Sequence, residues 1–555
     1  MNFAGVERPS ETALAERYAE IDARLERAES AKARRAAFGD WDALRREWRS
    51  WANLTRLRFS QDTRERECRS AQLELERRAP VVISFDAKVK RHLLAPEARR
   101  PLEGELGGQA FALWSADLGA YDDAIAADLV RESALSREYT ELLSEATVEF
   151  AGAPRTLPEL GPYRQSSDRE VRYGAERARW QIFSERRERL DAIFDELVRL
   201  RDGMARRLGD ESFTALGYKR MHRVDYGPAD VARYRDEVAR VVVPLAADLV
   251  RRLGREAGLD RVRFWDEGML ATQHALTPRG DRPWVVARAV EALAALDPAL
   301  GTFGNELVER DLLDLESRPG KAVGAYCTTV PSQRAPFVFA NFEGTRADIR
   351  TLMHELGHAF QAWNSLDKPV VDYLVPTYES AEIHSMSLEY LSWPEMDRFF
   401  GEDAAAYKRE HLIDAILFLP YGVAVDHFQH LVYAHPGATP SERNAMWQEV
   451  ERRYLPWRDY GDLAHPSLGG LWQEKRHIYL SPFYYIDYTL ALCCALQFWV
   501  RADRDRAEAM SAYVALCKRG GEAPFGELVS GAGLRSPFEA GALEEVVTAA
   551  GLALA

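Results

Sequence analysis

Apolar residues recur at three- and four-residue steps along most of this chain, which is the spacing of one face of a helix. Leu14, Tyr18, Ile21 and Leu25 show this spacing near the N-terminus, and residues 171–209 show it again. Turn-rich breaks interrupt the pattern at residues 152–163 and 225–230. We therefore predict a mostly α-helical protein, with an N-terminal helical lobe over residues 1–155 and a second region over residues 156–555.

Two short stretches depart from the helical pattern. KAVGAYCTTV (321–330) and PFVFANFEG (336–344) are rich in β-branched and aromatic residues and are separated by the turn-like PSQRA. They predict two strands of a small β-sheet. An edge strand at Gly324, Ala325 and Tyr326 can pair its free backbone groups with an extended peptide, or it can simply support the helices. The pattern alone leaves both interpretations open.

The stretch TLMHELGHAF (351–360) carries two histidines on one predicted helix. Thr345 and Asp348 form a capping-box pattern, which predicts a helix start near Arg346. At about 100° per residue, His354 and His358 project together, opposite a predicted core-facing stripe of Ile349, Leu352, Met353, Leu356, Phe360 and Trp363. Two imidazoles one turn apart can bind the same zinc ion. Glu355 follows directly and can take a proton from a water bound there.

A third ligand has to come from elsewhere in the chain. Gln361 and Asn364 exclude the pattern in which a third histidine follows on the same helix. A second predicted helix, residues 378–394, has three acidic candidates among apolar residues: Glu379, Glu382 and Glu389. Buried carboxylates need partners, so one can bind the metal while another orients a histidine. His384 is either a competing ligand or a hydrogen-bonded core histidine.

Composition narrows the classes of function that fit. The 555 residues are 46% hydrophobic, and 87 acidic residues against 73 basic ones give a formal net charge of −14. An acidic balance disfavours nucleic acid as a partner. No basic N-terminal region precedes an apolar run, and no apolar run reaches membrane-spanning length. Five cysteines without a framework spacing predict reduced thiols. We expect a cytoplasmic protein with no membrane partner.

HELGHAF followed by AEIHSMSLEYL resembles the thimet oligopeptidase and oligoendopeptidase F family of zinc metallopeptidases, most closely its bacterial oligoendopeptidases. PGKAVGAYC, PFVFANFEGT and RHIYLSPFYYIDYTLALCCALQFW extend the resemblance, which is weaker before about residue 150. It implies a two-lobed helical metallopeptidase with a deep central channel. It also implies one zinc ion per chain, held by His354, His358 and Glu382, with Glu355 as the general base and Glu389 orienting a ligand.

The resemblance further implies donors for the oxyanion that forms during peptide hydrolysis. His477, Tyr485 and Tyr488 match the family pattern best, with Tyr479 and Tyr484 as neighbours. The glycines that precede these tyrosines in the mammalian thimet pattern are missing from SPFYYIDY. The nearest candidates for a hinge are Gly469 and Gly470.

We therefore expect a zinc-dependent oligoendopeptidase that hydrolyses short unfolded peptides and aligns them along Gly324, Ala325 and Tyr326. Two alternatives stay open. A peptidyl-dipeptidase-like exopeptidase needs a cationic group that captures the carboxylate of the substrate, and the sequence does not place one. A non-catalytic peptide-binding protein needs no general base, so the presence of Glu355 argues against it.

Overall fold

The computed structural model describes residue 3, residues 5–271 and residues 276–555. Helices form most of it, as the periodicity predicts. The described chain divides into two compact units. The first unit comprises Met1–Tyr121, Ala275–Lys408 and Cys494–Ser536, and the second comprises Asp122–His274, Arg409–Cys493 and Pro537–Ala555. The boundary near residue 155 and the central channel stay predictions, and each unit takes segments from both sides of that residue.

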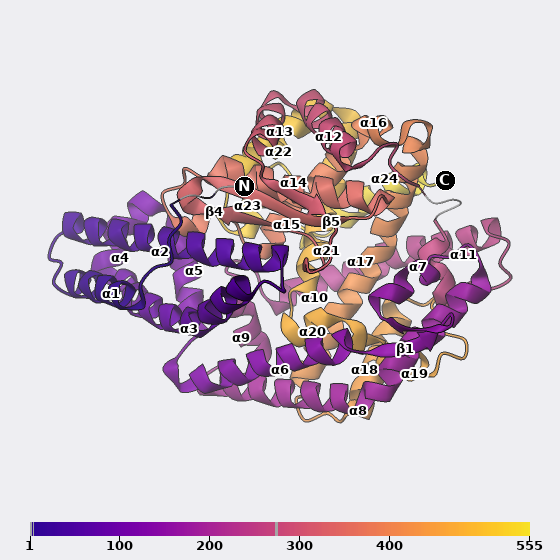
Figure 1. Ribbon diagram of the computed structural model, residues 1–555, viewed down its shortest axis with the longest axis horizontal. Coiled ribbons are helices and arrows are strands. Elements are labelled where there is room, and N and C mark those ends of the chain that lie inside the picture. The colour runs from indigo at the N-terminus through magenta and orange to yellow at the C-terminus, as the bar shows by residue number, and fades with distance from the viewer. Residues whose placement is uncertain (1–2, 4, 272–275) are drawn as a thin grey trace. The chain divides into compact units, whose positions relative to one another are not determined.

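The first unit combines N-terminal helices with a small sheet and the helix that bears the two histidines (Figure 1). Its elements are α1 (Glu11–Glu26), α2 (Ala31–Gln61), α3 (Arg66–Leu94), α4 (Pro96–Leu106), α5 (Gly108–Gly119), α12 (Arg282–Leu296), α13 (Pro298–Glu309), β3 (Leu313–Glu316), β4 (Tyr326–Val330), β5 (Ala335–Phe342), α14 (Arg346–Ser365), α15 (Tyr378–Leu391), α16 (Asp397–Phe400), α22 (Arg506–Arg519) and α23 (Phe525–Gly531).

The second unit is helical apart from one hairpin. Its elements are α6 (Ala126–Ser144), β1 (Thr147–Phe150), β2 (Ala153–Thr156), α7 (Gly161–Arg164), α8 (Arg169–Arg207), α9 (Phe213–Arg220), α10 (Pro228–Glu237), α11 (Val243–Glu256), α18 (Pro440–Tyr454), α19 (Ala464–Ser467), α20 (Arg476–Leu480) and α24 (Ala542–Ala553). The divisions between the units fall inside α17 (Ala404–Ala434) and α21 (Tyr485–Arg504).

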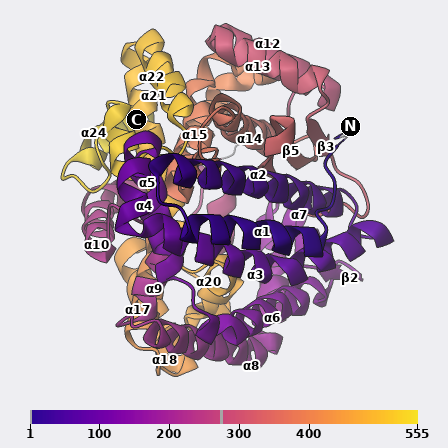
Figure 2. The same ribbon diagram turned by 90° about the vertical axis from the view of Figure 1, so that its left-hand side faces the viewer.

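The N-terminal helices α1, α2 and α3 lie side by side and enclose an apolar core (Figure 2). Ser10 and Ser30 accept hydrogen bonds from backbone amides three residues on and so cap the starts of α1 and α2. The four apolar residues that predicted α1 are all buried: Leu14, Tyr18, Ile21 and Leu25. They pack in one cluster with Phe38 and Trp41 of α2, so the predicted helix face is confirmed.

A buried carboxylate joins these helices to the segment that connects α14 and α15. Asp372 accepts hydrogen bonds from Arg45 of α2 at 2.5 Å, from Arg49 at 2.6 Å and from the indole of Trp114 at 2.9 Å. Burial raises the pKa of Asp372, but the charges of the two arginines outweigh burial and hold the pKa well below its ordinary value. The N-terminal helices therefore support the α14–α15 region through ionic as well as apolar contacts.

The predicted hairpin of the small sheet is confirmed, with β4 antiparallel to β5 and Tyr326 opposite Phe339. A third strand, β3, pairs parallel with β5, so the order is β3-β5-β4 and β4 lies at an edge. The sequence interpretation missed β3, and it treated residues 152–163 as a break where β1 and β2 form a hairpin. Strand β4 also begins at Tyr326, later than the predicted stretch.

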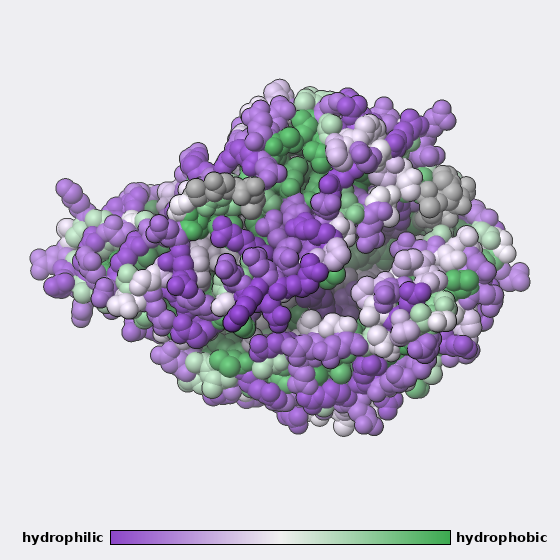
Figure 3. All heavy atoms as spheres, in the orientation of Figure 1, coloured by the Kyte–Doolittle hydropathy of each residue, from purple (hydrophilic) through white to green (hydrophobic). Residues whose placement is uncertain are grey.

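Hydrophilic residues cover most of the face drawn in Figure 3. Among the helices of residues 5–271 and 276–555, none combines the length and apolarity required to cross a bilayer. All five cysteines lie in the described part of the chain, and none of them is in a disulfide.

Candidate metal centre

Helix α14 starts at Arg346, as the capping box predicts. The Asp348 carboxylate accepts hydrogen bonds from the backbone amides of Glu343 at 3.0 Å, Gly344 at 2.7 Å and Thr345 at 2.9 Å. These bonds satisfy donors at the start of the helix and fix its direction beside β5. The predicted apolar stripe is buried from Ile349 to Phe360, and Trp363 is half-buried.

Helix α15 crosses α14 at Gly357, the glycine between the two histidines. A Cβ at this position would lie 2.5 Å from the backbone oxygen of His384 and 2.7 Å from the Cα of Ser385. Only a residue without a side chain allows the two backbones to come this close. Tyr513 of α22 also donates a hydrogen bond to the same His384 oxygen at 3.0 Å, which further holds this turn of α15.

Gly357→Ala should therefore separate α14 from α15 and weaken metal binding. Overpacking of this kind costs about 1–3 kcal/mol of folding free energy, and the shift of α15 moves Glu382 relative to the histidines. Zinc titration and chemical denaturation of the purified variant measure both effects. Gly104→Ala is the matched control, because a Cβ there meets nothing within 4 Å. Unchanged zinc affinity in Gly357→Ala would contradict the close-packing argument.

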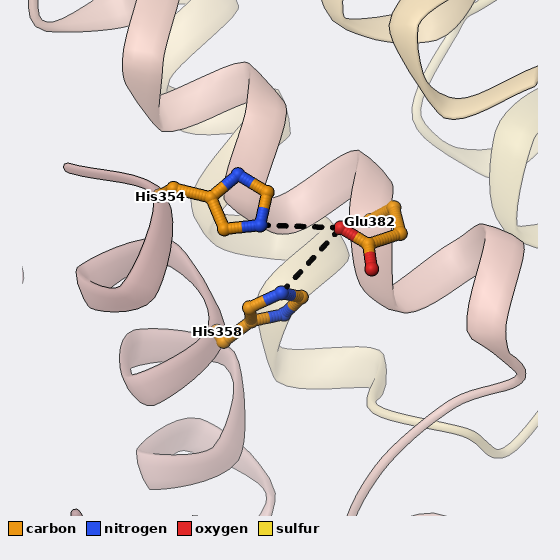
Figure 4. Close-up of side chains that lie close together, drawn as sticks. All are labelled: His354, His358 and Glu382. Carbon is orange, nitrogen blue, oxygen red and sulfur yellow. Dashed lines mark ion pairs between the residues drawn. The ribbon is translucent and has the colours of Figure 1, made fainter. Parts of the chain in front are cut away.

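The structure brings His354, His358 and Glu382 together. Figure 4 shows the two histidines on successive turns of α14, both directed at the carboxylate of Glu382 on α15. Glu382 Oε2 lies 3.3 Å from His354 Nε2 and 3.5 Å from His358 Nε2. Within the described residues, this is the one group of at least three histidine, cysteine or acidic side chains whose ligand atoms all lie within 4.8 Å of one another.

These distances fit a zinc ion. Nitrogen and oxygen donors bind zinc at about 2.0–2.2 Å, so neighbouring donors of a tetrahedral site stand about 3.3–3.5 Å apart. The donor set, two imidazoles and one carboxylate, leaves a fourth position for water, as catalytic zinc sites do. Both the distances and the ligand types are therefore compatible with zinc.

Two further side chains orient these ligands. Glu389 Oε1 lies 2.7 Å from His354 Nδ1, so the ring can donate a proton there and present Nε2 to a metal. Ser385 donates a hydrogen bond at 3.1 Å to Glu382 Oε2. Burial lowers the pKa of His354, but Glu382 and Glu389 raise it well above its ordinary value. Burial raises the pKa of Glu382, while hydrogen bonds to both histidines lower it well below its ordinary value.

Glu355 lies buried beside the two histidines, with 5% of its surface exposed. Burial raises the pKa of its carboxyl group, and the nearby histidines only partly oppose this effect. Its Oε2 atom is buried and makes no hydrogen bond to any residue that the structure describes. A buried carboxylate oxygen without a protein partner can accept a proton from a bound water.

His384 and Glu379, the other candidate ligands on α15, are not part of the cluster of His354, His358 and Glu382. The imidazole of His384 is fully buried and lies 2.7 Å, through Nδ1, from the Ser380 oxygen. Burial lowers its pKa to about 4, which matches the core-histidine interpretation. Glu379 accepts a hydrogen bond from Thr377 at 3.0 Å. Helix α15 ends at Leu391, three residues before the predicted end at Pro394.

The predicted substrate strand begins at an exposed glycine at the edge of the sheet. Gly324 has φ +100° and open space around its Cα, and Tyr326 begins β4. Asn341 of β5 donates hydrogen bonds of 2.9 Å to the backbone oxygens of Ala322 and Gly324. Lys321 anchors the start of this segment by donating to the Asp314 carboxylate at 2.9 Å and to the Ala340 oxygen at 2.6 Å. The strand therefore has a fixed conformation.

His477, Tyr485 and Tyr488 lie close to one another within the second unit. The ring centroid of His477 is 5.1 Å from that of Tyr485 and 6.1 Å from that of Tyr488. Burial and the nearby Lys475 lower the pKa of His477 to about 4, so the ring is neutral at pH 7. Lys475 donates a hydrogen bond of 3.4 Å to the Tyr485 hydroxyl oxygen, which leaves the Tyr485 proton for another acceptor.

Sequence reasoning missed three residues that shape these sites. Gly357 permits the helix crossing, Ser385 orients Glu382, and Asn341 fixes Gly324. Ser385 follows Glu382 by three residues on a helix, and this spacing predicts that the two side chains are neighbours. The contacts of Gly357 and Asn341 depend on tertiary packing, and no local pattern reveals them.

Comparisons with known proteins identify one family over most of the chain. The sequence profile described as peptidase family M3 matches residues 163–548, and the one described as peptidase M3 N-terminal domain matches residues 4–121. A search of curated proteins found no match.

Solved structures show the same similarity over nearly the whole chain. One described as PZ peptidase A with inhibitor 2 is 40% identical, covers 99% of this chain and 98% of its own, and has a TM-score of 0.94. A putative oligoendopeptidase F is 44% identical over 98% and 96%, with a TM-score of 0.93. Another, from Bacillus anthracis str. Ames, is 39% identical over 99% and 97%, with a TM-score of 0.89.

Proposed function

The chain belongs to peptidase family M3 and is a metalloendopeptidase, and we propose that it is a zinc-dependent oligoendopeptidase that cleaves short unfolded peptides. The observation that carries the proposal is the cluster of His354, His358 and Glu382 within 4.8 Å. Two imidazoles and a carboxylate suit zinc better than the hard cations, which prefer all-oxygen ligands. We propose one ion per chain at these three residues.

In the proposed peptide hydrolysis, Glu355 is the general base. His354, His358 and Glu382 would hold a zinc ion, which would supply a more acidic bound water and a Lewis acid for the scissile carbonyl group. Glu355 accepts the proton of that water as it attacks and then delivers the proton to the leaving amine. Its buried Oε2 atom, which has no hydrogen-bond partner among the described residues, is available to take that proton. Glu389 keeps His354 in the tautomer that binds through Nε2.

The edge strand supports the role proposed for Gly324, Ala325 and Tyr326. An extended peptide can pair with the exposed start of this edge at Gly324, since Asn53 of α2 already donates a hydrogen bond to the Thr329 oxygen farther along β4. Asn341 holds the Gly324 carbonyl and so keeps this edge in one conformation before substrate arrives.

We keep His477, Tyr485 and Tyr488 as the proposed donors to the oxyanion. This assignment rests on the family resemblance and on their mutual proximity in the second unit. A neutral His477 is a hydrogen-bond donor through one ring nitrogen, and the Tyr485 hydroxyl accepts from Lys475 and keeps its own proton to donate.

Elemental analysis together with mass-spectrometric mapping of cuts in a peptide mixture tests the proposal. We expect one zinc per chain, cuts at internal bonds of short peptides and no cuts in folded proteins. Amidating the C-terminus of a cleaved peptide should leave the rate unchanged, because an endopeptidase does not require the terminal carboxylate. Stoichiometric zinc without turnover of any short peptide would instead identify a peptide-binding protein.

A further inference from the structure

The segment between α20 and α21 contains an aromatic residue in an unusual backbone conformation. Phe483 has φ +66°, a region that bulky L-residues rarely occupy because the side chain crowds its own backbone. Surrounding contacts must impose such a conformation, and such residues concentrate at functional sites. Phe483 stands two residues before Tyr485 and five before Tyr488, both proposed oxyanion donors.

The ring of Phe483 is fully buried in the second unit. Its centroid lies 5.0 Å from that of His430 and 5.5 Å from that of Tyr433. Gly217 of α9 gives the ring its space, because a Cβ there would lie 2.6 Å from Phe483 Cδ2. The pocket for this ring is therefore closely fitted, and an added methyl group at position 217 would collide with it.

Side chains from distant parts of the second unit also hold the backbone of Phe483. Its amide donates to Gln429 Oε1 of α17 at 2.8 Å, and its oxygen accepts from Arg223 at 2.5 Å. The same nitrogen of Arg223 donates to Asp487 Oδ1 at 2.7 Å, and the side chains of this ion pair are fully buried. Arg223 thus joins the turn before α21 to the first turn of that helix, on either side of Tyr485.

We propose that Phe483, Gln429, Gly217 and the Arg223–Asp487 pair form a fixed clamp that sets the positions of Tyr485 and Tyr488 for catalysis. These are positioning residues that act through the two tyrosines. The proposal rests on the proposed function, since it concerns residues assigned to the oxyanion.

The clamp replaces the glycine-based mobility that the resemblance suggested for this segment. Gly469 and Gly470, the candidate hinge, are themselves closely packed. A Cβ at Gly469 would lie 2.3 Å from the Asn444 oxygen, and one at Gly470 would lie 2.5 Å from His465 Nε2. Space explains the glycine at position 470, and space together with φ +85° explains the glycine at position 469. A segment with a strained, fully buried anchor and tightly packed flanking glycines is suited to presenting donors that are already in place before reaction.

Asp487→Asn tests the clamp, with Arg223→Lys as its conservative partner. Asn keeps the shape of the acid but removes the charge that holds Arg223. We expect kcat to fall by about 100-fold, the loss that a displacement near 1 Å produces, with KM changed only a few-fold and zinc content unchanged. Arg223→Lys, made in the wild-type protein, keeps the positive charge opposite Asp487 and should lose less kcat than Asp487→Asn. Asp266→Asn is the control, because Asp266 forms a buried pair with Arg172 in the same unit, away from this segment. It should keep the kcat of the wild type.

Equal losses of kcat in Asp487→Asn and Asp266→Asn would overturn the proposal, since the pair would then be only structural. Hydrogen exchange of the wild-type protein gives a test that needs no activity. Amides of residues 483–488 should exchange far more slowly than those of the exposed residues Asp260 and Arg261 and should speed up in Asp487→Asn. Fast exchange of 483–488 in the wild type would overturn the clamp. A wild type without peptidase activity would overturn only the proposed function.

Discussion

Glu355→Gln should lower kcat by about 10²–10⁴, the usual contribution of a general acid–base group. The amide has nearly the shape of the carboxylate but cannot accept the proton of an attacking water. Because Glu355 is not one of the three proposed zinc ligands, the zinc content of this variant should stay at one ion per chain. Single-turnover cleavage of a short fluorogenic peptide, with elemental analysis of the same sample, measures both quantities.

Glu309→Gln provides the control for this variant, because Glu309 is an exposed residue at the end of α13. It should behave as the wild type in both measurements. Full activity of Glu355→Gln would end the assignment of the base. Loss of zinc together with activity would mean that Glu355 acts in holding the metal site, and the kinetic loss would then say nothing about proton transfer.

Glu382→Gln should weaken zinc binding by more than about 100-fold, because changing a residue that only orients a ligand already costs about 10–100-fold. The carboxylate is the one negative ligand of the three, and it lies 3.3 Å and 3.5 Å from the two imidazoles. An amide oxygen carries no charge with which to balance the cation. Titration of the metal-free protein with zinc, in competition with a chelator of known affinity, gives the size of the loss.

Glu389→Gln is the comparison that makes this measurement specific. Glu389 contacts His354 Nδ1, so its loss should weaken zinc binding within the 10–100-fold range, by less than the loss of Glu382. A variant Glu382→Gln that binds zinc as tightly as the wild type would rule out this residue as a ligand. A larger loss of zinc affinity in Glu389→Gln than in Glu382→Gln would instead make Glu389 the ligand and Glu382 the residue that orients it.

The helical elements near the site were largely predictable, because their signals are local. The capping box at Thr345 and the stripe from Ile349 onward gave the start and the buried face of α14. Strand β3 was missed because LDLE is four residues long and pairs with β5 only through tertiary contact. Hairpin β1–β2 was missed because AGAPRT contains the glycine and proline that also mark ordinary turns.

The residues of the candidate metal site needed different kinds of sequence evidence. His354 and His358 follow from helical spacing alone. Choosing Glu382 over Glu379 and Glu389 required the family resemblance, since all three are buried glutamates of α15. The sequence gives no signal for the positive φ of Phe483, because an aromatic residue next to tyrosines predicts only that the side chain packs in a core. Such a conformation is imposed by Arg223 and Gln429, which lie far from it in the chain.

The packing of α14 against α22 sets an order of events during synthesis on the ribosome. All three proposed ligands have been made once residue 382 has been added, but Tyr513, which stacks on Phe360 and bonds the His384 oxygen, comes much later. A nascent chain therefore carries its histidines and Glu382 before their support exists. We therefore expect the supported geometry of the site only after Tyr513 has been added, and a product terminated before that residue carries HELGH without the helix that steadies it.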